Sequence, residues 1–96
     1  MSDRPMTDAE IELALSDLPG WTHAGDRLER EWTFDGHFAA LAAATGVGIL
    51  NEQRNHHADL SVHYNRLRVS TTTHSAGNRV TDKDVDLAEA ITGLLD

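Results

Sequence analysis

The sequence contains no cysteine, which excludes disulfide bonds, thiolate metal clusters and thiol nucleophiles. It is also poor in bases, with eight Lys and Arg against sixteen Asp and Glu. Binding to a nucleic-acid backbone needs clustered Lys and Arg, so the net charge of −8 argues against such a partner. No apolar run approaches the roughly 18–20 residues that span a bilayer. The first residues lack the apolar stretch of a signal peptide, so we expect a cytoplasmic protein without a membrane partner.

What is present suits one small folded unit. A chain of 96 residues with 40% hydrophobic content can bury one modest core, so we expect a single domain, 1–96. Helical spacing of apolar residues predicts three helices, and alternation predicts four strands. In chain order these segments are 7–18 (helix), 21–24 and 28–34 (strands), 37–54 (helix), 60–64 and 67–74 (strands), and 81–95 (helix). The order α-β-β-α-β-β-α predicts an α+β fold, in which helices pack on one face of a four-stranded antiparallel sheet.

Four of the six histidines fall between residues 56 and 74. We expect a two-residue turn at Asn65–Arg66, because Asn tolerates positive φ. Extended beyond the strands, that register places His57 opposite His74, with Cβ atoms roughly 4.5–5.5 Å apart. His56 joins this pair only if the chain bends at the start of the strand. Glu52 precedes it by four residues, at the end of the long predicted helix.

Three chemical interpretations fit this histidine cluster. Paired imidazoles can donate a proton to one atom and remove one from another, which is acid–base catalysis. Imidazoles also bind zinc, but the sequence has no HExxH motif and no third ligand fixed by spacing. The histidines could also be ordinary polar surface residues of a small sheet. Convergence of a pair beside a third histidine and a carboxylate favours acid–base chemistry.

Several spaced motifs extend over nearly the whole chain. They are Leu18–Trp21, Glu52–Asp59, Tyr64–Asn65, Thr73–His74, Gly77 and Thr81–Asp84. Together they resemble the motifs of the pterin-4a-carbinolamine dehydratase family. The chain departs from that family in several respects. In the long helix, His37 stands at the position of a family aromatic and Ala replaces several large apolar residues. Ala58 stands where the family has a proline after the histidine pair, and the family's glycine pair is replaced by Gly77–Arg79.

The resemblance implies a dehydratase, a lyase that acts on 4a-hydroxytetrahydropterin. Such an enzyme removes the 4a hydroxyl as water, leaves the quinonoid dihydropterin and so recycles the pterin of aromatic amino acid hydroxylases. The resemblance also implies the same α+β fold, no metal and no cofactor, and a homodimer or homotetramer. Its pterin substrate is the expected small-molecule partner.

The resemblance implies site residues as well. His56, His57 and His74 form the implied catalytic set, in which His56 and His74 act as acids on the leaving hydroxyl and His57 holds the pterin. The implied substrate-binding residues are Trp21, Glu52, Ala58, Thr73, Ser75 and Ala76. Asp84 matches an aspartate that the family keeps near its site. As the fourth residue of the Thr81–Asp84 box it also suits a helix cap, and the pattern favours the cap.

A second function stays open at this point. Relatives of this fold serve as a dimerisation cofactor of a transcription factor and as assembly factors of other enzymes. The altered residues Ala58 and Asn78–Arg79 favour such a non-catalytic interaction module. The Ala- and Gly-rich helix at 37–54 favours it too, because small residues allow close packing against a partner.

Overall fold

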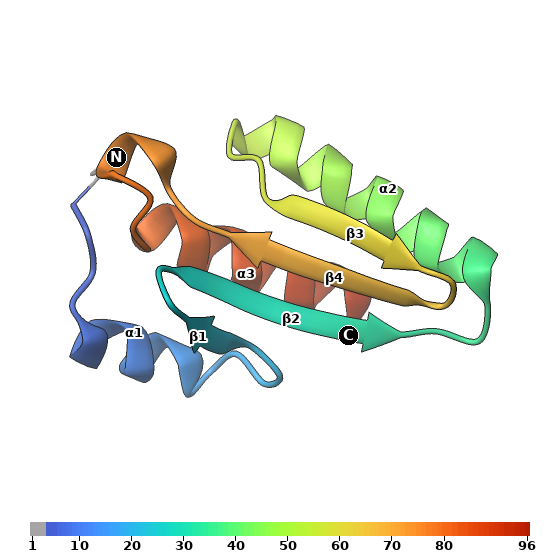
Figure 1. The fold of residues 1–96 in the computed structure, drawn as a ribbon, viewed down its shortest axis with the longest axis horizontal. Helices are drawn as coiled ribbons and strands as arrows, with labels where there is room; N and C mark the ends of the chain where they lie inside the picture. The colour runs from blue at the N-terminus through green and yellow to red at the C-terminus, as the bar shows by residue number, and fades with distance from the viewer. Residues whose placement is uncertain (1–3) are drawn as a thin grey trace.

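The computed structural model describes residues 4–96, and these form three α-helices, four strands and one short 3-10 helix (Figure 1). In chain order they are α1 (Asp8–Leu15), β1 (Thr22–Ala24), β2 (Arg27–Thr33), α2 (His37–Arg54), β3 (Asp59–His63), β4 (Arg66–Thr71), η1 (His74–Ala76) and α3 (Asp82–Leu95). All strand pairs are antiparallel, in the order β1-β2-β4-β3. The predicted fold class and element order are therefore confirmed.

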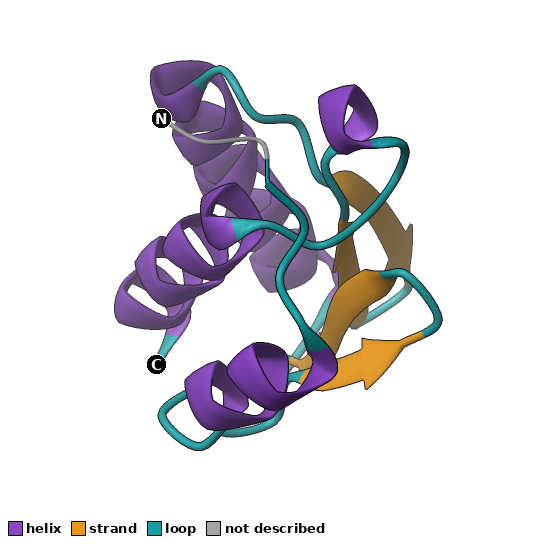
Figure 2. Ribbon diagram, turned by 90° about the vertical axis from the view of Figure 1, so that its left-hand side faces the viewer, coloured by secondary structure: helices purple, strands orange, loops and turns teal. Residues whose placement is uncertain are grey.

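The helices gather on one side of the sheet, and the core lies between these two layers (Figure 2). Alternating apolar residues of β2 and β4 point into it. The fully buried side chains include Leu28, Leu67 and Val69 from the sheet, with Val47, Leu87 and Ile91 from α2 and α3. Each such side chain contributes roughly 1.5–3 kcal/mol by leaving water, so this layer supplies most of the driving force for folding.

Arg30 interrupts the apolar face of β2, and its contacts with Trp32 and Asp96 explain how a charged side chain is accommodated there. Its guanidinium carbon lies 4.3 Å from the centre of the Trp32 ring, and its Nη1 lies 2.9 Å from Asp96 Oδ2. The indole nitrogen of Trp32 donates to the same carboxylate. The hydrogen bonds from Arg30 and Trp32 hold the pKa of the Asp96 carboxyl below its usual value. A charged residue on the core face is thus paired and stacked rather than buried alone.

The β3–β4 turn corrects the predicted register. Val62 pairs with Leu67, so the two turn residues are Tyr64–Asn65, with Tyr64 at φ 52°. Contacts with the β2–α2 connection and with the start of α2 hold the turn there. His37 stacks on the Tyr64 ring, and Asn65 Nδ2 donates to the carbonyl of Phe34. These tertiary contacts outweigh the preference of Asn for the left-handed position.

This two-residue shift changes which residues meet beyond the strands. Every side chain keeps its predicted face, because the shift is even. The observed register, extended past β3, aligns His57 with Thr72. In addition, β4 ends at Thr71 and His74 begins η1. The expectation that His57 and His74 oppose each other across the hairpin is therefore wrong.

A capping box formed by Thr7 and Glu10 closes the start of α1, and it yields a test of pH dependence. Thr7 N donates to Glu10 Oε1 at 2.8 Å, and Glu10 N donates to Thr7 Oγ1 at 3.2 Å. Hydrogen bonds from Arg4 and from the Thr7 backbone lower the pKa of Glu10 from 4.5 to about 2. Since the folded state favours the ionised form, its contribution is present above pH 4.5 and is lost as the pH falls toward 2.

We therefore expect Glu10→Gln to unfold at a lower temperature than the parent chain at pH 7. Glutamine still accepts from the Thr7 backbone but carries no charge. The difference should shrink progressively below pH 4.5. Thermal unfolding followed by circular dichroism at several pH values measures it. A difference that is the same at pH 7 and near pH 2 would show that the charge of Glu10 is unimportant.

Candidate active site

A cavity of about 360 Å³ lies where the end of α2, the β4–η1 connection and the start of α3 meet. All three predicted catalytic histidines line it, together with two predicted binding residues. The lining residues are Asn55, His56, His57, Thr72, Thr73, His74, Ser75 and Lys83. The fold thus brings the histidine pair and the Thr-His motif to one place, although not through the predicted hairpin pairing.

The end of α2 provides the bend that His56 requires. Asn55 caps this helix in the left-handed conformation, with φ 49° and ψ 43°. Asn adopts this conformation more readily than most residues. The next amide, of His56, donates to the Asn51 carbonyl at 3.0 Å and completes the cap. As a result the two consecutive histidines take different partners.

His57 lies in the connection after α2 and contacts a carboxylate in the last turn of that helix. Its Nε2 lies 2.7 Å from Glu52 Oε1, and both side chains are largely exposed. A carboxylate only accepts, so this contact assigns the imidazole proton to Nε2. Glu52 is not itself among the lining residues, so its contact with the cavity is through His57.

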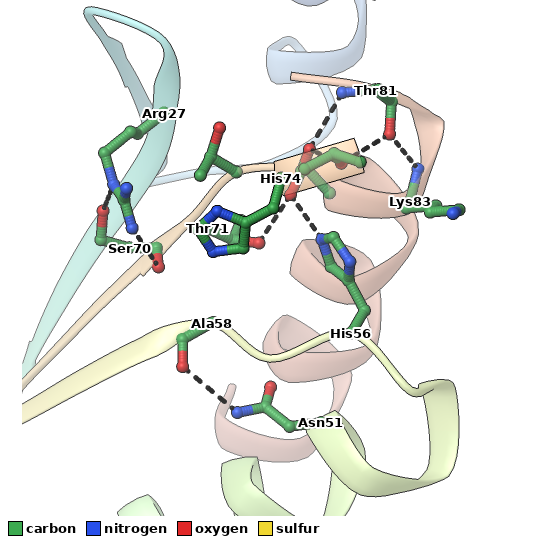
Figure 3. Close-up of polar contacts among 12 residues, drawn as sticks. Arg27, Asn51, His56, Ala58, Ser70, Thr71, His74, Thr81 and Lys83 are labelled. Carbon is green, nitrogen blue, oxygen red and sulfur yellow. Dashed lines mark hydrogen bonds and ion pairs between the residues drawn. The ribbon is translucent and has the colours of Figure 1, made fainter. Parts of the chain in front are cut away.

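His56 points in the other direction, toward the start of α3 (Figure 3). Its Nε2 lies 2.7 Å from Asp84 Oδ1, and only 12% of its side chain is exposed. Asp84 is fully buried. Two buried hydroxyls also donate to its carboxylate, Thr71 Oγ1 to Oδ1 at 2.6 Å and Thr73 Oγ1 to Oδ2 at 2.7 Å.

The sequence left two roles open for Asp84, a helix cap and a residue near the site. In the structure its carboxylate makes both contacts. Thr81 N donates to Asp84 Oδ2 at 2.9 Å, so the carboxylate closes the capping box of α3 as predicted. The same carboxylate holds His56 through its other oxygen. The cap and the histidine orientation therefore depend on one side chain.

His74 occupies the opposite side of the cavity in η1 and is exposed. Its Nδ1 lies 2.7 Å from Asn78 Oδ1. An amide oxygen accepts, so His74 carries its proton on Nδ1 and leaves Nε2 unprotonated in the neutral ring. Asn78 has φ 60°, and its backbone N–H donates to the Thr73 carbonyl. This asparagine thus adds a hydrogen bond to a predicted catalytic histidine.

Four predicted binding residues lie outside the cavity lining: Glu52, which contacts His57, and Trp21, Ala58 and Ala76. Trp21 is buried in the core, where it meets the Trp32 ring edge-to-face and donates from Nε1 to Thr92 Oγ1 at 2.9 Å. Ala58 is also buried in the core, and its carbonyl accepts from Asn51. Ala76 is part of η1 and is not among the lining residues. A substrate-binding role for these residues stays a prediction.

Sequence reasoning missed three lining residues, Asn55, Thr72 and Lys83. Asn55 directly precedes the histidine pair, and Lys83 directly precedes Asp84. Their closeness in sequence to these predicted site residues was the available signal. Thr72 is buried and donates from Oγ1 to the carbonyl of Asp26 at 2.8 Å.

Within residues 4–96, no group of three or more His, Asp or Glu is arranged to hold a metal ion. Over the same residues, no helix is long and apolar enough to cross a membrane.

The fold and cavity define a small α+β protein with a histidine-lined site. Residues 4–94 match the family described as Pterin 4 alpha carbinolamine dehydratase, and the chain belongs to this family. It is 43% identical to a provisionally named pterin-4-alpha-carbinolamine dehydratase of Thermosynechococcus vestitus, over 98% of this chain and 97% of the relative. A relative of the same provisional name in Streptomyces coelicolor is 39% identical, over 98% of this chain and 93% of the relative.

A solved structure supports the same assignment. It is the crystal structure of a transcriptional coactivator/pterin dehydratase from Brucella melitensis, which superimposes with a TM-score of 0.90. The two sequences are 26% identical, and the match covers 97% of this chain and 100% of the other. The predicted family is therefore confirmed.

Proposed function

We propose that this protein is a hydro-lyase that dehydrates 4a-hydroxytetrahydropterin to the quinonoid dihydropterin. The observation that carries the proposal is the convergence of His56, His57 and His74 on one cavity, where each ring is held by a hydrogen bond. Membership of the dehydratase family supports the substrate class. Regeneration of the pterin used by aromatic amino acid hydroxylases, in the cytoplasm, is the corresponding cellular role.

The reaction is redox-neutral, and two imidazoles can supply its proton transfers. The bond between C4a and the hydroxyl oxygen breaks, and the electron pair of the adjacent ring nitrogen forms the new C=N bond. That nitrogen loses its proton, while the departing oxygen gains one and leaves as water. We assign the acid role on the leaving oxygen to His56 and His74, and whichever of the two is neutral accepts the proton from nitrogen. One proton is given and one is taken, so the reaction needs no cofactor.

The direct test generates the 4a-carbinolamine in solution and follows its decay by ultraviolet absorbance. The purified protein should accelerate the decay in proportion to its concentration. A rate equal to that of buffer alone would overturn the proposed activity.

His57 is proposed to hold the pterin rather than to transfer a proton. We expect His57→Ala to raise KM about tenfold, which corresponds to one lost hydrogen bond of about 1.4 kcal/mol. The value of kcat should change less than about threefold. Steady-state kinetics over a range of pterin concentrations separate the two parameters. His63→Ala, an exposed histidine on β3 outside the cavity lining, is the matched control.

The contrary result would be a large fall in kcat at unchanged KM. His57 would then take part in the chemical step, and the division of roles among the three histidines would have to be revised.

A homo-oligomer, either a homodimer or a homotetramer, is part of the proposal. Its support is the exposure of large apolar side chains on α2, where Phe38 is 83%, Ile49 54% and Leu41 43% exposed. Exposed apolar surface of this kind is typical of interfaces. Light scattering after size-exclusion chromatography measures the mass in solution. A mass of one chain would contradict this part of the proposal.

The same α2 surface favours a second candidate, a non-catalytic interaction module. The structural relative from Brucella melitensis is described as a coactivator as well as a pterin dehydratase. A stable partner that co-purifies with the protein, without pterin binding, would support this candidate. Dihydropterin binding that depends on His57 would argue against it.

A further inference from the structure

The carboxylate of Asp84 has its full number of hydrogen-bond donors. Two carboxylate oxygens offer about four acceptor positions. Oδ2 accepts from Thr73 Oγ1 and from Thr81 N, while Oδ1 accepts from Thr71 Oγ1 and from His56 Nε2. Figure 3 shows contacts from His56 and Thr81 converging at the start of α3. Of the two donors on Oδ1, only His56 lines the cavity.

Thr71 is an unusual member of its strand. Leu67, Val69 and Thr71 alternate along β4, and all three are fully buried. Thr71 lies opposite Leu28 of β2, in the apolar layer where a valine of the same shape would fit. The feature that distinguishes it from valine is the hydroxyl, 2.6 Å from Asp84 Oδ1. The contact joins the central sheet to the carboxylate that holds His56.

We propose that Thr71 is a positioning residue for His56, a role that rests on the proposed dehydratase function. Its hydroxyl fills one acceptor position of Asp84 Oδ1 and leaves the other directed at the imidazole. The carboxylate is then fixed, and His56 keeps its proton on Nε2. The other ring nitrogen, Nδ1, is left to exchange a proton with substrate. Without the hydroxyl, Oδ1 has a vacant position, and the imidazole loses its defined orientation and tautomer.

The test compares Thr71→Val, which keeps the shape and removes the donor, with Thr71→Ser, which keeps the donor. Long-range proton–nitrogen spectra of ¹⁵N-histidine-labelled protein report the tautomer of each ring, and the His56 signals are identified by their loss in His56→Gln. The parent chain and Thr71→Ser should show the Nε2-protonated tautomer. Thr71→Val should show a mixture of tautomers and a kcat lowered about tenfold at a KM within about twofold.

Two further variants sharpen the comparison. Thr71→Cys carries a weak donor and should fall between serine and valine in both readouts, which keeps the series informative if the valine variant fails to fold. Ser70→Ala removes a neighbouring hydroxyl that contacts Arg27 and Glu29 instead of Asp84, and it should change neither readout.

An unchanged His56 tautomer in Thr71→Val would overturn the inference, even if kcat fell, because the loss would then not act through His56. If Thr71→Ser did not keep the parent tautomer and kcat, the inference would also be overturned. Packing of the threonine methyl, rather than its hydroxyl, would then be responsible for the effect. The spectra need no turnover. An inactive parent chain would therefore refute the proposed function, while the tautomer comparison would still decide the role of Thr71.

Discussion

Replacement of His56 by glutamine is expected to lower kcat for carbinolamine dehydration at least 100-fold while the protein remains folded. A glutamine amide can donate to Asp84 from nearly the position of the imidazole Nε2, so the buried carboxylate keeps its fourth donor. The amide cannot give or accept a proton near neutral pH. Proton transfer by a positioned side chain contributes typically about 10²–10⁴ in rate, which sets the expected loss. Single-turnover kinetics with the transient carbinolamine and thermal unfolding measure the two properties separately.

The appropriate control is His23→Gln, because His23 lies on β1 and is not part of the cavity lining. It should keep the parent rate. His74→Gln, on the other side of the cavity, should show a loss comparable to that of His56→Gln if both rings transfer protons. Retention of more than about a tenth of the parent kcat by His56→Gln would exclude a proton-transfer role for this residue.

Replacement of Asp84 by asparagine should have the largest effect on stability. An amide presents one accepting oxygen and one donating nitrogen, so two of the four donors around this position would face another donor. Leaving buried groups unpaired in this way is expected to cost about 3–5 kcal/mol. For a domain of this size, the midpoint of thermal unfolding should fall by at least about 12 °C. Urea unfolding at constant temperature gives the free energy directly.

Asp82→Asn provides the comparison for this prediction. Asp82 is an exposed acid in the first turn of the same helix, and its loss should cost less than about 1 kcal/mol. A similar small cost for Asp84→Asn would mean that the buried network contributes little. Activity of the asparagine variant should also fall, since His56 would lose its carboxylate partner.

Local patterns were sufficient to predict the fold because each element carries its own signal. The helix α2 has the bounds 37–54 that its apolar spacing predicts, and the capping box of α3 forms at the predicted residues Thr81 and Asp84. The error lies in the β3–β4 turn. There, contacts of Tyr64 with His37 at the start of α2 and of Asn65 with Phe34 in the β2–α2 connection decide the register. Such contacts join segments about thirty residues apart in sequence, so no short pattern reveals them.

The candidate site was predicted unevenly for a similar reason. The histidines stand in spaced motifs, and Asp84 stands in a helix cap, so both could be found. Thr71 could not, because strand alternation assigns it to the apolar layer and the sequence does not show that a carboxylate lies against it. Trp21 was assigned to the pocket by resemblance. Its contacts with Trp32 and Thr92 lie in the core, and its role in binding stays a prediction.

The double role of Asp84 bears on how homologous sequences should be sorted into active and inactive members. Natural selection for a folded chain is enough to preserve this aspartate, because the α3 cap and the buried threonine hydroxyls depend on it. A descendant that had lost dehydration and kept only an interaction role would therefore still carry it. Exposed His74 closes no cap and fills no core, so drift would remove it first. Under the proposed function, its retention, rather than that of Asp84, is the informative marker of a working enzyme.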